Sequence, residues 1–326
     1  MRKIFVLAAL ILFVVSACRK TDHSIDDISA NEIFKEPIQR KCASHEIFEQ
    51  QMNSDPLLRE KVKEIEEFTQ RIIANSENFR LLPDGIIEIP VVVNVLYKTT
   101  AQNISIEQIQ SQIDVLNQDF SATNADYNTA SPFEAVRSGD IRIRFVLDNV
   151  VRLKAKVQSW PINDAMKKSS KGGINPTSPQ TKLNFWVCNL TSGYLGYAQF
   201  PGGNASTDGV VIDDNAFGTI GNLYDDYNKG RTATHEVGHW MNLRHIWGDA
   251  NCGNDLVNDT PVHTTSNFGC PSNATSNCGG VLHPMMTMNY MDYTDDLCMY
   301  MFTADQKTRM LAVFAAGGSR NSFAQP

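Results

Sequence analysis

The hydrophobic and polar positions of this 326-residue chain follow two periods, which predict strands and helices. Residues 86–97, IIEIPVVVNVLY, form a nearly unbroken β-branched run, typical of a strand that is buried on both faces. Residues 141–148, IRIRFVLD, alternate apolar and polar positions and predict a strand with one buried face. KLNFWVC and GVVID predict two further strands. GYLGYAQFPGG, between them, predicts a short edge strand that borders a cleft.

Three segments instead repeat apolar residues every three or four positions, the period of an α-helix. The first, residues 55–75, begins with Asp55 as the N-cap and Pro56 at the first helical position. Each of the other two begins with the side-chain pattern of a capping box. These two pairs are Ser105 with Gln108 and Thr303 with Gln306.

This order predicts an α+β fold with a mixed sheet, followed after about residue 245 by an irregular lower part. Hydrophobic residues make up 42% of the chain, enough to bury a full core. The formal net charge of −7 argues against nucleic acid as a partner. We expect a monomer that contacts a membrane only through a lipid anchor.

The stretch HEVGHWMNLRH, residues 235–245, contains three of the chain's 7 histidines. His235 and His239 are four residues apart, so on a helix they lie on one face and can bind one metal ion. Glu236 can then point its carboxylate at a water on that metal, as in the H-E-x-x-H zinc hydrolases, and act as general base.

His245 cannot use the same helix face, because six residues correspond to a rotation of about 600°, which leaves it about 120° out of line. The helix must therefore end between His239 and His245. Asn242 stands where the break is needed, and asparagine tolerates the left-handed conformation better than most residues. We predict a positive φ at Asn242 and a turn that returns His245 to the metal.

These residues resemble the H-E-x-x-H-x-x-G-x-x-H signature of the metzincin metalloproteases, with Asn242 in place of the usual glycine. The segment NYMDYTDDLCMYMFT, residues 289–303, resembles the Met-turn of the pappalysin-like branch, called cytophagalysins in bacteria. The resemblance covers about residues 89–314. It implies that Met291 lies beneath a zinc ion and that Tyr293 is a catalytic tyrosine.

By this resemblance the fold is a metzincin-type zincin, with a twisted sheet and an active-site helix above a disulfide-linked lower subdomain. The activity it implies is zinc-dependent endopeptide hydrolysis of proteins or peptides. Three alternatives stay open: a helix pair of purely structural histidines, a zinc hydrolase of a non-peptide amide, and a non-enzymatic surface lipoprotein with a vestigial metal site. The intact Glu236 argues against the last.

The first residues, MRKIFVLAALILFVVSAC, combine two positive charges with an apolar run that is too short to span a membrane. We predict a signal peptide over residues 1–17. VSAC also resembles the bacterial lipobox, which implies export, lipidation at Cys18, and an outer-membrane or cell-surface location. The mature form could then be released from the anchor. Ordinary signal cleavage with an unmodified Cys18 thiol is the alternative.

Export allows disulfides, and four cysteines follow the zinc signature in a segment rich in Gly, Asn, Thr and Pro. Four cysteines permit three pairings. The resemblance implies two of these crosslinks, Cys252–Cys278 and Cys270–Cys298. Cys188, inside a predicted strand, is interpreted as a buried free thiol.

Cys42 lies well before the predicted catalytic domain, and a thiolate is a strong zinc ligand. Arg40 and Cys42 resemble the R-x-C pattern of pappalysin-like pro-segments, in which the cysteine blocks the metal. We therefore predict a pro-segment over residues 18–86 with Cys42 as a cysteine switch, and a catalytic domain over residues 87–326. Maturation near Arg80 is weakly specified, and a free Cys42 thiol is the alternative.

Two further hypotheses concern the lower part. CGNDLVNDTP offers hard oxygen ligands for Ca²⁺ from Asp255, Asp259 and Thr260, although loop capping by these residues is the other interpretation. The segment after the Met-turn of metzincins borders the pocket for the residue that follows the cut. Asp296, more than Asp295, could line that pocket and select a basic residue, against a solvated role for both.

Overall fold

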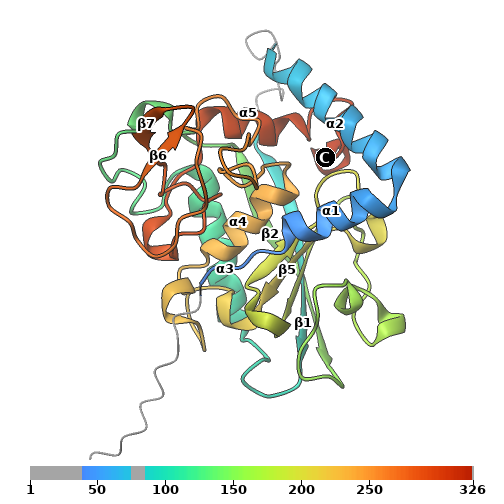
Figure 1. The fold of residues 1–326 in the computed structure, drawn as a ribbon. Helices are drawn as coiled ribbons and strands as arrows, with labels where there is room; N and C mark the ends of the chain where they lie inside the picture. Colours follow the sequence, from blue (N-terminus) through green and yellow to red (C-terminus); the bar gives the residue numbers. More distant parts are fainter. Residues whose placement is uncertain (1–38, 75–84, 325–326) are drawn as a thin grey trace, which may run out of the picture. The chain divides into compact units, whose positions relative to one another are not determined.

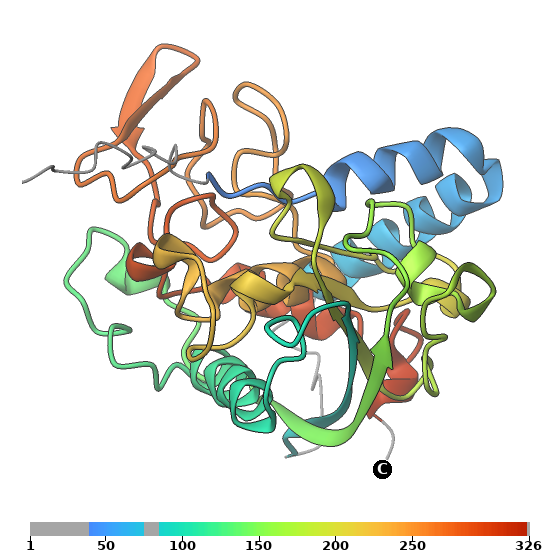
Figure 2. The same ribbon diagram turned by 90° about the horizontal axis from the view of Figure 1, so that it is seen from below.

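Five strands form one twisted sheet in the order β2-β1-β3-β5-β4. The first four are parallel, and β4 runs antiparallel to β5 at the edge of the sheet. The strands are β1 (Ile87–Tyr97), β2 (Ile143–Lys154), β3 (Leu183–Cys188), β4 (Gly196–Ala198) and β5 (Val210–Asp213). This computed structural model describes residues 39–74 and 85–324 (Figures 1 and 2). The short edge strand and the buried β1 agree with the sequence pattern.

Two helices cover one face of the sheet. α3 (Ile106–Ser121) packs on β2, α4 (Arg231–Trp240) packs on β4 and β5, and the two helices contact each other. Alternate residues of β1, Val91, Val93 and Val95, belong to the core cluster beneath these helices. α4 is buried along its whole length, so the sheet fixes the position of the helix that carries the first two histidines.

Two sequence predictions about the elements need correction. β2 begins at Ile143 and continues to Lys154, beyond the predicted end at Asp148, because it pairs with β1 along its full length. The Ser105 hydroxyl accepts a hydrogen bond from the Gln108 backbone N–H as expected, but the Gln108 side chain donates to the Phe217 carbonyl instead of completing a capping box. A tertiary contact therefore replaces the local one.

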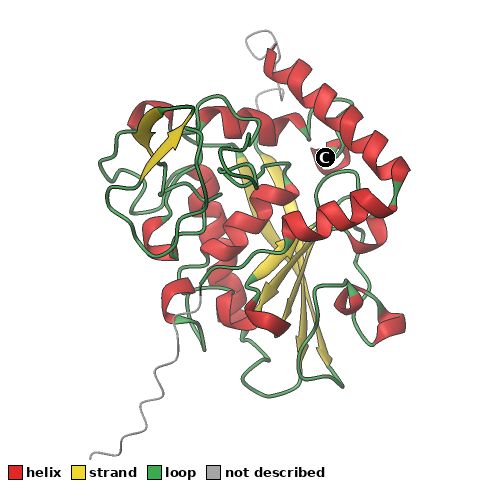
Figure 3. Cartoon of the chain, in the orientation of Figure 1, coloured by secondary structure: helices red, strands yellow, loops and turns green. Residues whose placement is uncertain are grey.

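The part that follows α4 is mostly loop (Figure 3). It contains a hairpin of β6 (Thr275–Cys278) and β7 (Val281–Pro284), and it leads to α5 (Ala304–Ala312). α5 begins with the predicted capping box, in which Thr303 and Gln306 exchange hydrogen bonds. Disulfides join Cys252 to Cys278 and Cys270 to Cys298, the pairing that the resemblance implies.

Residues 39–74 will be called the N-terminal segment. They enter along α4 and then form α1 (Ser44–Ser54) and α2 (Pro56–Ala74), drawn in blue in Figure 1. Asp55 caps α2 by accepting hydrogen bonds from the N–H groups of Leu57 and Leu58. α1 contacts β4, and α2 contacts α5. The N-terminal segment thus packs against both parts of the remaining chain.

The predicted signal peptide over residues 1–17, the lipidation site Cys18 and the maturation region at Arg80 all lie outside the described residues. Within 39–74 and 85–324, no helix combines the length and the apolar character that a membrane span requires.

Candidate active site

Three histidine rings meet at the end of α4. His235 and His239 lie one turn apart on this helix, and their Nε2 atoms are 3.2 Å apart. The Nε2 atom of His245 lies 3.1 Å from that of His239. All three side chains are buried, with at most 1% of their surface exposed. The spacing read from the sequence therefore does bring these three residues together.

The turn at Asn242 makes this meeting possible. α4 ends at Trp240, and Asn242 has a φ of 74°, the left-handed conformation that the sequence analysis requires. The Leu243 N–H then donates back to the Gly238 carbonyl over 2.9 Å, which satisfies an open carbonyl of the last helical turn. The chain reverses within three residues and returns His245 to the helix.

The other ring nitrogens indicate what the three histidines are prepared to bind. The Nδ1 atoms of His235 and His239 lie 2.7 and 2.8 Å from the carbonyl oxygens of Tyr290 and Leu243. His245 Nδ1 lies 2.5 Å from the Asp249 carboxylate. Because each partner is an acceptor, each Nδ1 carries the proton and each Nε2 presents a lone pair to the other two.

Three convergent lone pairs in a buried space repel one another unless a cation lies between them. Burial lowers the pKa of His235 and His239 well below the ordinary range, which keeps their rings neutral and suited to a metal. The Cys42 thiol completes the set: its sulfur and one nitrogen of each histidine all lie within 4.8 Å of one another. Three nitrogens and one sulfur fit the tetrahedral preference of Zn²⁺.

Glu236 lies beside this donor set and faces the N-terminal segment. Its Oε2 accepts a hydrogen bond of 2.7 Å from the Ser44 hydroxyl and lies 3.4 Å from Cys42 Sγ. Burial raises the pKa of Glu236 to about 7, so its carboxyl group can exchange protons near neutral pH. Nothing in the sequence predicts this contact of Ser44 with Glu236.

Met291 packs against α4, and Tyr293 contacts the N-terminal segment. Met291 is fully buried directly against Gly238, where an added Cβ would come within 2.5 Å of its sulfur. The Tyr293 hydroxyl donates to the Cys42 carbonyl over 3.2 Å. The Trp247 ring stacks on His245 at 4.3 Å between centroids, a neighbour that sequence reasoning missed.

Asp296 is buried and binds an arginine of the N-terminal segment. Its Oδ1 lies 2.6 Å from an Arg40 guanidinium nitrogen, and both side chains are only 1% exposed. Its Oδ2 accepts from the backbone N–H groups of Lys229 and Arg231. Asp295, by contrast, is half-buried. The solvated interpretation is therefore wrong for Asp296.

The N-terminal segment also adds backbone pairing to the edge strand. Cys42 forms a parallel bridge with Gly196, in which the Leu195 N–H donates to the Lys41 carbonyl and the Ala43 N–H donates to the Gly196 carbonyl. Gly196 lies against Glu236, since a Cβ built there would come 3.1 Å from Glu236 Cγ. The edge strand, the three histidines and Glu236 thus border one cleft, which the N-terminal segment occupies.

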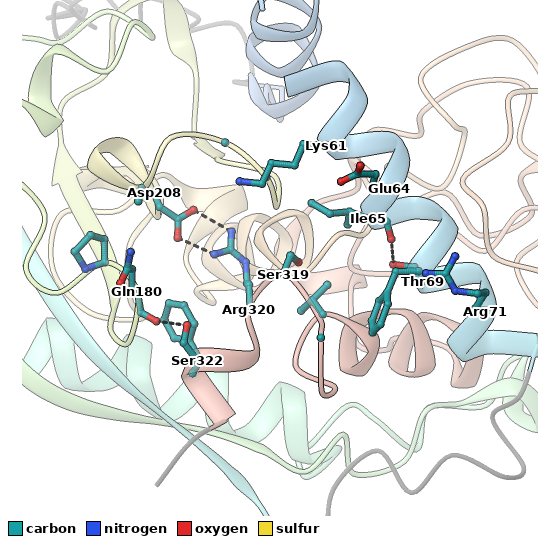
Figure 4. A pocket seen from close by; sticks show the side chains of 18 residues that line it. Lys61, Glu64, Ile65, Thr69, Arg71, Gln180, Asp208, Ser319, Arg320 and Ser322 are labelled. Carbon is teal, nitrogen blue, oxygen red and sulfur yellow. Dashed lines mark hydrogen bonds and ion pairs between the residues drawn. The ribbon is translucent and has the colours of Figure 1, made fainter. Parts of the chain in front are cut away.

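Because the N-terminal segment fills this cleft, the larger cavities of the described residues lie elsewhere. One of about 560 Å³ separates α2 from the C-terminal residues, where Figure 4 shows Lys61, Ile65 and Thr69 of α2 across from the Asp208–Arg320 ion pair. Its walls carry none of the metal-binding histidines.

The suggested calcium ligands separate into two groups. Asp255 is buried and accepts hydrogen bonds from the Thr260 hydroxyl and the Val257 N–H. Both oxygens of Asp259 instead accept from the Thr303 hydroxyl and the Asp305 N–H, at the start of α5. Asp259 therefore caps a helix in this structure. Cys188 is a buried free thiol in β3, as predicted.

Comparisons with known proteins agree with this geometry. The family model described as pregnancy-associated plasma protein-A matches residues 179–315. An extracellular metalloprotease of Verticillium alfalfae is 34% identical over 236 residues, which cover 68% of this chain and 77% of that protein. One from Colletotrichum graminicola is 32% identical over 265 residues, covering 77% of this chain and 86% of its own length.

Two solved structures are similar over nearly their full length. A mutant of Tannerella forsythia promirolysin is 41% identical with a TM-score of 0.78, and the match covers 87% of this chain and 97% of that chain. Mature mirolysin of the same organism, in complex with a cleaved peptide, is 44% identical with a TM-score of 0.71. That match covers 74% of this chain and 97% of the mirolysin chain.

Proposed function

The chain belongs to the pappalysin-like metalloprotease family, and from this premise we propose that it is a zinc endopeptidase made as a latent precursor that cuts peptide bonds before basic residues. The observation that carries the proposal is the convergence of three imidazole Nε2 atoms beside the carboxyl group of Glu236. His235, His239 and His245 would hold the zinc, which supplies a Lewis acid at the bond to be cut.

The chain's own residues account for the remaining steps. Glu236, with its pKa raised to about 7, can take a proton from the attacking water and return it to the leaving amine. The Tyr293 hydroxyl already donates to a peptide carbonyl, that of Cys42, and the same hydroxyl suits the scissile carbonyl as negative charge develops on its oxygen. The edge strand β4 can bind the substrate backbone as it now binds residues 41–43.

Replacing Glu236 with Ala tests the reaction. We expect peptidase activity on unstructured casein to fall by about 10²–10⁴-fold, because general acid–base catalysis is lost. Zinc content and thermal midpoint should stay close to the wild-type values, since the three histidines are unchanged. If the wild-type protein binds zinc but does not cleave casein, the proposal is wrong. The protein would then be a surface-binding lipoprotein or a hydrolase of a non-peptide amide.

The preference for a basic residue rests on Arg40. Its guanidinium lies in the pocket of Asp296, bonded to the carboxylate and to the Thr294 carbonyl, while the Cys42 sulfur faces the histidines. In a substrate, the residue bound in the Asp296 pocket would come directly after the peptide bond that is cut at the metal. In the N-terminal segment the pocket residue comes before the residue at the metal, so the chain runs in the opposite direction and presents no bond in register for cleavage.

Replacing Asp296 with Asn tests this preference. We expect kcat/KM for peptides with Arg after the cut to fall relative to Leu peptides, by about 1.5–3 kcal/mol of transition-state binding. Asp295→Asn is the matched control and should keep the Arg-to-Leu ratio, because Asp295 is half-buried and does not bind Arg40 in this structure. A library profile with aliphatic residues after the cut in both variants and the wild type would contradict the proposal.

Three parts of the proposal concern export and anchoring, latency, and calcium binding. We infer export from residues 1–17 and a lipid anchor at Cys18 from the lipobox alone, and palmitate labelling that Cys18→Ser abolishes would support it. We propose that the N-terminal segment belongs to the pro-segment, because its residues occupy the cleft at three points. We also propose that Ca²⁺ binds at Asp255 and Thr260, whose oxygens lie 2.8 Å apart.

A further inference from the structure

Arg309 presents a guanidinium group whose outer nitrogens bind only the N-terminal segment among the contacts described. Its Nε donates to the Asn242 carbonyl over 2.8 Å, which holds the side chain from behind. Its two terminal nitrogens donate to the two carboxylate oxygens of Glu66, over 2.8 and 2.6 Å. Arg309 is fully buried, so this is a bidentate ion pair between α5 and α2.

A small cavity of about 20 Å³ lies between Glu66 and residues that contact the histidines. Its walls on the catalytic side include Phe200, Asn242, Arg244 and Asp249. Asp249 binds His245, and the Phe200 ring lies 5.2 Å from the His239 ring. Its other wall consists of α1 and α2 residues, Glu66 among them. When the N-terminal segment leaves, the surface between the histidines and Arg309 therefore becomes open to a substrate.

The cavity borders His45 and Phe48 of α1, which follow Cys42 in the chain, whereas Asp296 binds Arg40, which precedes Cys42. In the N-terminal segment, Arg40 occupies the Asp296 pocket, Cys42 faces the histidines, and α1 follows directly at Ser44. Figure 1 shows the segment crossing α4 in this order before it turns into α2. A peptide that places a basic residue at Asp296 would thus extend its residues before the cut toward Arg244 and Arg309.

We propose that Arg309, assisted by Arg244, forms a subsite of the mature enzyme for an acidic side chain on the amino-terminal side of the cut. This inference rests on the proposed function. Loss of Glu66 leaves a pre-positioned guanidinium with two free donors, and a planar fork of this kind matches a carboxylate. Glu66 would thus occupy its subsite as Arg40 occupies that of Asp296.

The charges around Glu66 support a carboxylate as the ligand. Burial alone would raise the pKa of Glu66. Hydrogen bonds and charge from Arg309, with a contribution from Arg244, instead lower this pKa. Asp255 is an internal carboxyl group close enough for Arg309 to affect its pKa. Its two oxygens already accept from Val257 and Thr260. Arg309 is therefore free to accept an outside partner.

The test compares matched peptides with the mature enzyme obtained by maturation of the full precursor. Each pair has Arg after the cut and differs only in Glu or Gln at one of the four positions before it. We expect kcat/KM to favour Glu about tenfold at one or two positions, and the ratio to fall with added salt. Arg309→Gln should bring the ratio near one, and Arg244→Gln should lower it.

Two further variants keep the result interpretable. Arg309→Lys retains a donor near the Asn242 carbonyl but lacks the fork, so it should lower the Glu preference even if Arg309→Gln fails to fold. Lys307→Gln removes a cation from the same helix whose nitrogen donates to the Ser138 and Asp140 carbonyls, and it should keep the preference. Glu236→Ala cannot mature itself, so its precursor is processed in trans by wild-type enzyme that is then removed. Fluorescence anisotropy with this processed variant gives the same comparison as binding without cleavage.

The outcomes separate the two levels of inference. Equal kcat/KM and equal binding for every Glu and Gln pair, in an enzyme that cleaves both, would overturn the subsite, with Arg309 then paired internally. A Glu preference that survives in Arg309→Lys and Arg244→Gln would overturn it as well. A mature protein that cleaves neither peptide would instead refute the proposed function.

Discussion

Arg40, Cys42 and Ser44 lie within five consecutive residues, and each contacts a different part of the site. Arg40 binds Asp296, the Cys42 sulfur joins the three histidines, and the Ser44 hydroxyl donates to Glu236. This part of the segment runs beside the edge strand, where Cys42 forms a parallel bridge with Gly196, and α1 begins directly afterwards at Ser44. While the segment stays in place, it covers the three histidines, Glu236 and Asp296 at the same time, the residues that we propose for the metal site, the general base and the specificity pocket.

If Cys42 blocks the metal, Cys42→Ala should shorten the lag before autoactivation of the purified precursor. The reason is that the alanine offers no fourth donor, so a water can bind, although Ser44 and Arg40 still hold the segment. Activity against a quenched peptide, followed over time at several precursor concentrations, measures the lag. Cys188→Ala is the matched control, since this free thiol is buried in β3, and it should keep wild-type latency. Equal latency in all three proteins would show that Cys42 is not the blocking group.

At the residue scale, the sequence predicts what depends on local spacing. His235 and His239 follow from the helical period, and the φ of Asn242 follows from the break that His245 requires. Ser44 could not be predicted, because its contact with Glu236 joins residues 192 positions apart. The same holds for Arg40 as the partner of Asp296, 256 positions away. Such contacts are fixed only when the sheet and α4 place the two segments together.

At the element scale, the ion pair of Glu66 with Arg309 is a polar contact that joins α2 to α5. Burial alone would raise the pKa of Glu66, but hydrogen bonds and charge from Arg309, with smaller contributions from Gln70 and Arg244, together lower it in the folded protein. A lowered pKa means that the pair stabilises docking above the ordinary value of glutamate, 4.5, and that this contribution disappears as the pH falls through the lowered value. Docking of α2 should therefore weaken in acid.

The thermal midpoint of a Glu236→Ala precursor, which cannot digest itself, measures this effect. At pH 6–7 we expect Glu66→Gln in that background to lower stability by about 1 kcal/mol, or about 2–3 °C, because Glu66 remains partly exposed. The difference between the two proteins should shrink below pH 4.5. Glu64→Gln, an exposed residue of the same helix, is the control and should show no such dependence. A difference that is constant from pH 7 to pH 3 would assign the effect to packing.

Where apolar residues repeat with a clear helical or strand period, the type of element could be predicted from the sequence. The length of the element was less predictable. α2 and α5 begin at the predicted caps, because Asp55 and Thr303 bind neighbouring N–H groups. The end of β2 was not predictable, since its last residues alternate weakly and are ordered by pairing with β1. Hydrogen bonds from a partner strand can extend a strand beyond the length that the local sequence predicts.

At the scale of the whole molecule, the sheet and its helices bury apolar residues that repeat with a regular period. The mostly irregular part after α4 is instead held by disulfides and by helix-capping hydrogen bonds. Cys270–Cys298 ties the loop before β6 to the segment that follows Tyr293. Asp259 ties a second loop to the start of α5 through Thr303 and Asp305. The absence of an apolar period correctly predicted an irregular region, but its path depends on these links, whose pairing only the family resemblance indicated.

A bound Ca²⁺ near Asp255 would act on this lower part as a whole. Asp255 is 5% exposed, and burial raises its pKa to about 7, so a cation that replaced the proton would relieve the desolvation of its charge. Because Asp259 links the same loop to α5, we expect EGTA to lower the thermal midpoint of the zinc-loaded protein by several degrees, and Ca²⁺ but not Mg²⁺ to restore it. Zinc content must be measured before and after, since EGTA also binds zinc. Asp255→Asn should remove the response to Ca²⁺. An unchanged midpoint at constant zinc would leave Asp255 as the loop cap that its bonds to Val257 and Thr260 already make it.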